Sequence, residues 1–230
     1  IKASAVRILY KPKSGGPYML NLIDTPGHVD FTYEVSKSLR ACEVALLLVD
    51  AGQGVEAQTV ANLDLALEHN LEIIPVINKI DLPSADVAGP RAEIMRLVGC
   101  GADEIHAVSA KDGTGVAELL AVIVKKIPPP KINNQLSIIN NQSLRALVFD
   151  SKYDPYLGVV AHIRIVDGTL KKGERIFFVA SGADAEVLEV GVFLPERSEA
   201  AGLSVGEIGY VATGLKRPTA VRVGDTITKF

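Results

Sequence analysis

The chain has 230 residues, of which 48% are hydrophobic, and a formal net charge of -3 at pH 7. That length and apolar content suffice for one large or two small buried cores, and the nearly balanced charge gives no support for nucleic-acid binding through bulk charge. The apolar runs reach only strand length, so we expect no membrane-spanning helix. Two cysteines, Cys42 and Cys100, are too few for a disulfide framework and favour a reducing compartment.

The first ten residues alternate like a β-strand and contain no uninterrupted apolar segment, so the sequence predicts no signal peptide. The chain begins with Ile1 rather than Met. We therefore expect it to be an internal piece of a longer protein.

Residues 1 to about 127 alternate apolar strands with amphipathic helices. Apolar side chains recur at helical spacing around Leu63 and again around Leu119. Continuous apolar strands followed by helices predict a largely parallel sheet covered on both faces, in which ligands bind beyond the carboxyl ends of the strands. The predicted strands of this part are residues 6–10, 19–23, 44–50, 73–78 and 105–108.

The sequence changes character after Pro128-Pro129-Pro130, which ends the last predicted helix because proline cannot continue it. Asn and Gln are frequent from there to residue 143, which predicts a linker in which Ile138-Ile139 could form a short strand. Beyond the linker, β-rich runs alternate with glycine-containing turns and predict a small β-barrel. Its predicted strands are residues 144–149, 159–166, 176–179, 187–193 and 208–211. We thus divide the chain into an α/β domain at 1–127, a linker at 128–143 and an all-β domain at 144–230.

A first polar motif, Asn78-Lys79-Ile80-Asp81, directly follows a predicted strand. The carboxylate of Asp81 can accept two parallel hydrogen bonds from the N1 and the exocyclic amine of guanine, a pattern that adenine does not offer. Asn78 can tie the loop to neighbouring backbone and reach the purine, and the aliphatic stem of Lys79 can cover one face of the ring. Taken alone, the motif is as readily a loop with turn-forming polar residues.

Ser109-Ala110-Lys111 follows the next predicted strand. A small residue at this place lets a backbone N–H approach the purine O6, and Lys111 can flank the ring. An isolated Ser-Ala-Lys loop is usually a structural turn. Together, at adjacent strand ends, the two motifs predict one guanine-binding pocket.

A third motif, DTPGH at residues 24–28, also follows a predicted strand. Asp24 suits an outer-sphere ligand of Mg²⁺, a cation that keeps much of its water beside nucleotide phosphates, and Gly27 lets a backbone N–H approach a terminal phosphate. We assign His28 the catalytic role of orienting or polarising the water that attacks this phosphate. The alternatives are a plain Pro-Gly turn and a surface or helix-capping histidine.

These motifs and their surroundings resemble the translational GTPases over nearly the whole chain, except around residues 132–142. Residues 24–35 (DTPGHVDFTYEV) resemble switch II of the family, and residues 49–59 (VDAGQGVEAQT) resemble the stretch after its next strand. Residues 72–86 (EIIPVINKIDLPSAD) are more similar to the LepA (elongation factor 4) type than to elongation factor G. Residues 158–173 (GVVAHIRIVDGTLKKG) resemble the β-barrel second domain of these factors.

The resemblance implies an incomplete Ras-like α/β GTP-binding domain followed by a translation-factor barrel. It implies hydrolysis of GTP to GDP and phosphate on the ribosome, with Mg²⁺, in connection with tRNA translocation. The implied partners are the ribosome, through rRNA and small-subunit contacts of the barrel, and tRNA indirectly. We expect a monomer without membrane insertion, in the cytoplasm or alternatively in the mitochondrial or plastid matrix.

The sequence departs from the family in two respects: it contains no GxxxxGK[ST] phosphate loop and no switch I threonine. We expect these parts before Ile1, and further domains after Phe230, so this chain alone is expected to be inactive. Two other functions stay open. One is a non-catalytic ribosome-binding module, favoured if the native product begins near Ile1; the other is a guanine-nucleotide sensor without a translational role, against which the barrel argues.

Overall fold

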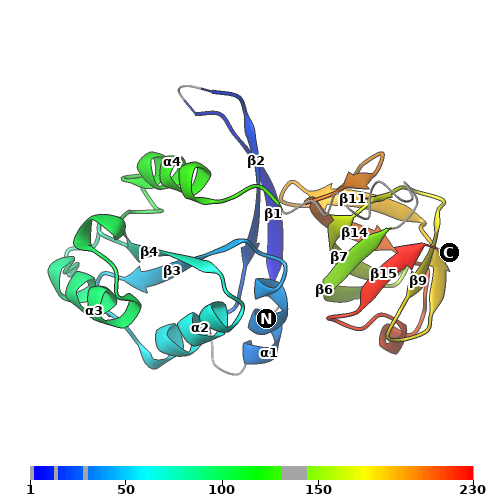
Figure 1. The fold of residues 1–230 in the computed structure, drawn as a ribbon, viewed down its shortest axis with the longest axis horizontal. Helices are drawn as coiled ribbons and strands as arrows, with labels where there is room; N and C mark the ends of the chain where they lie inside the picture. Colours follow the sequence, from blue (N-terminus) through cyan, green and yellow to red (C-terminus); the bar gives the residue numbers. More distant parts are fainter. Residues whose placement is uncertain (1–2, 13–14, 28–30, 131–143, 230) are drawn as a thin grey trace. The chain divides into compact units, whose positions relative to one another are not determined.

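A computed structural model describes residues 3–12, 15–27, 31–130 and 144–229 (Figure 1). The predicted linker core, the proposed Ile138-Ile139 strand and the segment that looked foreign to the family lie outside the described residues. Contacts divide the chain into two compact units, Gly27–Pro128 and Ile1–Pro26 with Pro129–Phe230. Each unit is described by itself below.

The unit Gly27–Pro128 contains a three-stranded parallel sheet in the order β3-β4-β5. Its strands lie within one or two residues of the predicted bounds, which confirms the parallel α/β arrangement of this part. The strands are β3 (Val44–Asp50), β4 (Glu72–Asn78) and β5 (His106–Ala107). The helices are α1 (Thr32–Leu39), α2 (Ala57–Glu68), α3 (Ala88–Val98) and α4 (Val116–Lys126), with a 3-10 turn at Ala102–Glu104.

Helices lie on both faces of this sheet, although Leu48 of β3 is 58% exposed. Val35 of α1 and Ala66 of α2 belong to one buried cluster, against which Ala45 of β3 packs. Ile94 of α3 joins a second cluster with Val49 at the far end of β3. Figure 1 shows α4 on the opposite side of the sheet from α1 and α2. In the described part of the chain, no helix combines the length and the apolar character needed to span a membrane.

The first two strands differ from the prediction. We expected residues 6–10 and 19–23 to belong to the largely parallel sheet, but β1 (Ser4–Tyr10) and β2 (Tyr18–Asp24) pair antiparallel with each other in a sheet of their own. The connecting sequence KPKSGGP is short and rich in turn-forming residues, which favours a hairpin of the two strands. Within its unit the hairpin contacts the β-rich part: Arg7 forms an ion pair with Glu207 at 3.0 Å and donates to the Ile208 carbonyl at 3.2 Å.

The β-rich part is an eight-stranded antiparallel sheet in the order β10-β9-β15-β6-β7-β14-β11-β12, with a small β8-β13 pair beside it. Figure 1 shows it curling on itself, as expected for the predicted all-β barrel. Its longer strands are β6 (Arg145–Asp154), β7 (Gly158–Asp167), β9 (Arg175–Phe178), β11 (Glu189–Phe193), β14 (Ile208–Ala212) and β15 (Thr226–Lys229). The short ones are β8 (Thr169–Leu170), β10 (Asp184–Glu186), β12 (Arg197–Glu199) and β13 (Leu203–Ser204), and a 3-10 turn lies at Pro218–Ala220.

One apolar core fills the inside of this curled sheet, with Ile163, Phe178 and Ile227 among its fully buried members. A buried carboxylate joins two segments of the β-rich part. Asp225 is 3% exposed and accepts hydrogen bonds from three backbone N–H groups. The donors and distances are Ala180 at 2.7 Å, Ser181 at 3.1 Å and Thr226 at 2.7 Å. Because these donors are partly buried, the carboxylate satisfies groups that would otherwise be costly to bury.

Candidate functional site

Polar side chains gather at the carboxyl ends of β4 and β5, which lie beside each other because the strands are parallel. Asn78 is the last residue of β4. Its Oδ1 accepts hydrogen bonds from the Lys79 N–H at 2.8 Å and from the Ala110 N–H at 3.1 Å. One amide side chain therefore holds the loops after both strands together, which is the tying role expected for Asn78.

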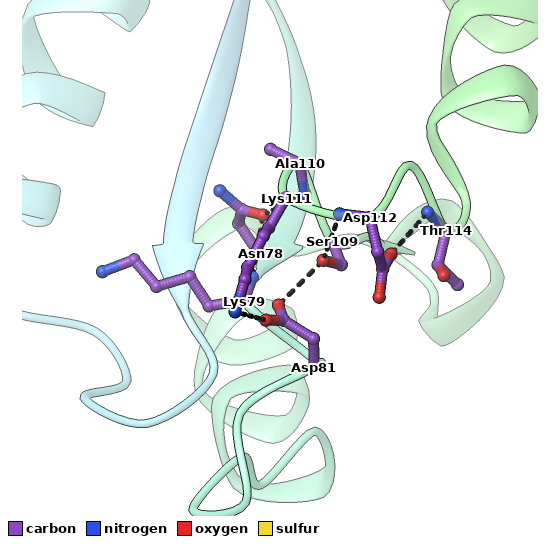
Figure 2. A network of polar contacts seen from close by, with 8 residues as sticks. All are labelled: Asn78, Lys79, Asp81, Ser109, Ala110, Lys111, Asp112 and Thr114. Carbon is purple, nitrogen blue, oxygen red and sulfur yellow. Dashed lines mark hydrogen bonds and ion pairs between the residues drawn. The ribbon is translucent and has the colours of Figure 1, made fainter.

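Asp81 lies at the centre of this group of side chains. Its Oδ1 accepts a hydrogen bond from the Ser109 hydroxyl at 2.8 Å, and its Oδ2 lies 3.8 Å from the Lys111 ammonium. Figure 2 shows Asp81, Ser109 and Lys111 turned toward one another. Ser109 is fully buried, whereas the Lys111 side chain is 83% exposed, so the hydroxyl fixes the carboxylate more firmly than the ammonium does.

The turn after β5 keeps Ser109 in place. The Ser109 N–H donates to the Thr114 carbonyl at 2.9 Å, and Asp112 Oδ1 accepts from the Thr114 N–H at 2.9 Å. Gly115 closes the turn with φ +73°, where an added Cβ would lie 2.4 Å from the Ala107 carbonyl oxygen. Only glycine fits there without displacing backbone, so the sequence after Lys111 builds the turn that presents Ser109.

Asp50, the last residue of β3, extends the site and was missed in the sequence analysis. Parallel register places it opposite Asn78, and its Oδ2 lies 2.6 Å from the Lys79 ammonium. The hydrogen bond from Lys79, and next that from the Gly52 N–H, hold the pKa of Asp50 below its ordinary value. The same carboxylate raises the pKa of Lys79. An aspartate that ends an apolar strand next to a motif-bearing strand is the signal that could have identified it.

The arrangement can accept two donors from one ligand edge. A carboxylate offers about four lone-pair positions, and in Asp81 one of these takes the Ser109 hydroxyl. The remaining positions suit a ligand that presents two adjacent N–H donors, as the Watson–Crick edge of guanine does. The Ala110 N–H already donates to Asn78, so its expected approach to a purine O6 stays a prediction.

The predicted phosphate-side residues are Asp24, Gly27 and His28. Asp24 ends β2 and is exposed, in the unit that contains the hairpin. Gly27 begins the other unit, is exposed and has open space where a Cβ would stand. His28 lies outside the described residues, so its catalytic role stays a prediction.

The part of the chain that the structure describes contains no cluster of three or more His, Cys, Asp or Glu side chains that could hold a metal ion. A single exposed carboxylate such as Asp24 nevertheless suits Mg²⁺, which retains several waters and binds chiefly to nucleotide phosphates. The role of Asp24 as an outer ligand of Mg²⁺ stays a prediction.

Comparison with protein families gives two matches. The family described as elongation factor Tu GTP binding domain matches residues 1–129, and elongation factor Tu domain 2 matches residues 158–228. The first match covers more than half of the chain and includes all three polar motifs.

Among curated proteins, the relatives include elongation factor 4 from Thermotoga maritima, 55% identical, from Dehalococcoides mccartyi, 54% identical, and from Bacillus cereus, 53% identical. Each match extends over 228 residues, or 99% of this chain, and covers 36% or 37% of the relative. The chain thus spans little more than a third of the length of these relatives. The expected resemblance to translational GTPases of the LepA (elongation factor 4) type is confirmed.

Proposed function

The chain belongs to the elongation factor Tu GTP-binding domain family, and we propose that it forms the guanine-nucleotide-binding and barrel part of a ribosomal GTPase of the elongation factor 4 type. The activity is hydrolysis of GTP to GDP and phosphate in connection with tRNA translocation. We keep the domain division at 1–127, 128–143 and 144–230 on the basis of the two family matches, although the contacts group residues 1–26 with the β-rich part.

The observation that carries this proposal is the network around Asp81. Its carboxylate is held by the buried Ser109 hydroxyl at 2.8 Å, at the carboxyl edge of a parallel sheet. Asn78 fixes the two loops that flank it. A preformed acceptor pair of this kind selects guanine, because adenine presents no matching pair of donors. Lys79 and Lys111 supply aliphatic stems that can flank the base.

We assign the phosphate side to DTPGH. Gly27 leaves room for a phosphate close to the backbone, and Asp24 would hold water of a bound Mg²⁺ ion. Mg²⁺, when bound, neutralises the phosphate charge that develops in phosphoryl transfer. His28 positions the attacking water. Because the 230 residues contain no GxxxxGK[ST], we propose that this chain alone binds nucleotide weakly and does not turn it over.

The barrel part is proposed to contact rRNA and the small ribosomal subunit, and the protein to affect tRNA indirectly. The names of the curated relatives and the domain 2 match support a translational role. We propose a monomer located in the cytoplasm, as befits relatives from bacteria; the alternative is an organelle matrix.

An NMR titration of the 230-residue chain tests the proposal, since it detects binding into the millimolar range. GDP is expected to move the backbone amide signals of Lys79 and Ala110 in a saturable way, and ADP at equal concentration to move them much less. Equal shifts with GDP and ADP, or shifts confined to other parts of the chain, would contradict a guanine site at these loops.

A further inference from the structure

One carboxylate at the end of β3 links two separate parts of the candidate site. Asp50 Oδ1 accepts a hydrogen bond from the Gly52 N–H at 2.7 Å, and its Oδ2 lies 2.6 Å from the Lys79 ammonium. The first contact shapes the turn after β3; the second reaches the loop after β4. The Asp50 side chain is only 17% exposed, whereas that of Lys79 is 56% exposed, so the carboxylate is the fixed partner of the pair.

Lys79 has an unusual backbone for its residue type. Its φ is +65°, in the left-handed region that residues other than glycine seldom adopt. Figure 2 shows its long side chain running away from Asp81 while Lys111 runs toward it. Without an anion at its far end, a side chain with four methylene groups would sample many rotamers. The contact with Asp50 selects one direction for it.

We propose that Asp50 is a positioning residue for the base site. By binding the ammonium of Lys79, Asp50 fixes the direction of the lysine side chain, so that its methylene stem can cover one face of a bound guanine. This inference rests on the proposed function, because it presumes a base beside Lys79. Its benefit is preorganisation, since a side chain that is ordered before binding loses less entropy when the ligand arrives.

A purely structural role for Asp50 would be confined to the turn after β3, where its side chain accepts from the Gly52 N–H. Asp50→Asn separates the two roles. The side-chain carbonyl of asparagine can still accept from the Gly52 N–H, but its amide group is a donor where Oδ2 stood and cannot pair with an ammonium. Glu93→Gln is the matched control. Like Asp50, Glu93 accepts from a backbone N–H of the segment after β3, that of Val55, with its Oε2 at 2.8 Å. In the described part of the chain Glu93 has no hydrogen bond or ion pair with Lys79.

The test is a double-mutant cycle on the 230-residue chain, with dissociation constants for GDP and ADP taken from NMR titrations. Asp50→Asn is expected to weaken GDP binding by roughly 2- to 10-fold, the range that follows from ordering one long side chain. In the Lys79→Met background the same substitution should change GDP affinity by less than about 1.5-fold, because the group through which it acts is gone. Glu93→Gln should leave GDP affinity near that of the wild type.

The outcomes separate this inference from the proposed function. Equal losses from Asp50→Asn with and without Lys79, or no loss at all in a wild type that prefers GDP to ADP, would overturn the positioning role and leave the guanine site intact. A wild-type chain that binds GDP and ADP alike would overturn the guanine site, and the positioning role with it.

Discussion

Removal of one hydroxyl group, in Ser109→Ala, tests whether the hydrogen-bonded network sets the shape of the site. The Ser109 hydroxyl is fully buried and donates to Asp81 at 2.8 Å. A hydrogen bond to a charged group contributes about 1.5 to 3 kcal/mol net. The hydroxyl also accepts from the Asp112 N–H at 3.3 Å, a longer and partly buried contact that we expect to add little. We therefore expect the free energy of unfolding of the unit Gly27–Pro128 to fall by about 2 kcal/mol.

The measurement is urea unfolding followed through NMR signals of that unit, so that unfolding of the other unit does not enter the value. Ser84→Ala serves as the control, because Ser84 is exposed in the loop after Asp81 and surface substitutions usually change stability by less than about 0.5 kcal/mol. GDP affinity should fall together with stability in Ser109→Ala only. If Ser109→Ala unfolds at the same urea concentration as Ser84→Ala, the hydroxyl does not hold the carboxylate and the reasoning is wrong.

Three further predictions concern other parts of the chain. In an intact protein that carries these residues, His28→Ala should slow ribosome-stimulated GTP cleavage by roughly 10²-fold with little change in nucleotide affinity; normal single-turnover cleavage with a lowered melting temperature would instead indicate a structural role. Asp225→Ala should cost about 3 to 5 kcal/mol in urea unfolding of the β-rich part, because three backbone N–H groups lose their acceptor; a loss below about 1 kcal/mol would contradict this. The pKa of Asp154 is lowered to about 2, chiefly by the hydrogen bond from Arg197. The stabilising effect of the ionised Asp154 is therefore complete above the ordinary pKa of 3.8 and is lost as the pH falls through about 2. Asp154→Asn should flatten this part of the acid unfolding curve, and an unchanged curve would refute the prediction.

The elements predicted best from sequence were the strands β3 and β4. Their apolar runs are continuous and lie beside helices, although Leu48 of β3 is 58% exposed, and the polar residues that end them mark the sheet edge. Asn78, Asp81 and Ser109 could be placed together for the same reason. Lys79 and Lys111 could be assigned to the pocket, but not the directions in which their side chains run, because those depend on partners from other strands.

The failures have physical causes as well. The prediction for β1 and β2 was wrong because an apolar run of strand length does not specify which strand it pairs with, and here the two strands pair with each other through the turn-rich connection. Helix α3 begins Ala-Gly-Pro, and glycine is a poor helix former that weakens the helical signal, although proline is tolerated in a first turn. The short strands β8, β10, β12 and β13 are too brief for an alternation to be recognised. The place of Asp50 at the end of an apolar strand can be read from the sequence, but its contact with Lys79 depends on the register between β3 and β4, which sequence spacing does not contain.

The central claim is that Asp81 recognises guanine, and the most direct test is the nucleotide preference of Asp81→Asn beside that of the wild type. The amide can donate where the carboxylate accepted, so the variant should lose affinity for GDP and gain affinity for XDP, whose base has a carbonyl in place of the exocyclic amine. In a competition titration we expect the ratio of GDP to XDP affinity to fall by at least roughly tenfold, the scale of one hydrogen bond to a charged group. Asp112→Asn, which keeps an acceptor for the Thr114 N–H, should retain the wild-type preference. An Asp81→Asn chain that still prefers GDP as the wild type does would contradict the account.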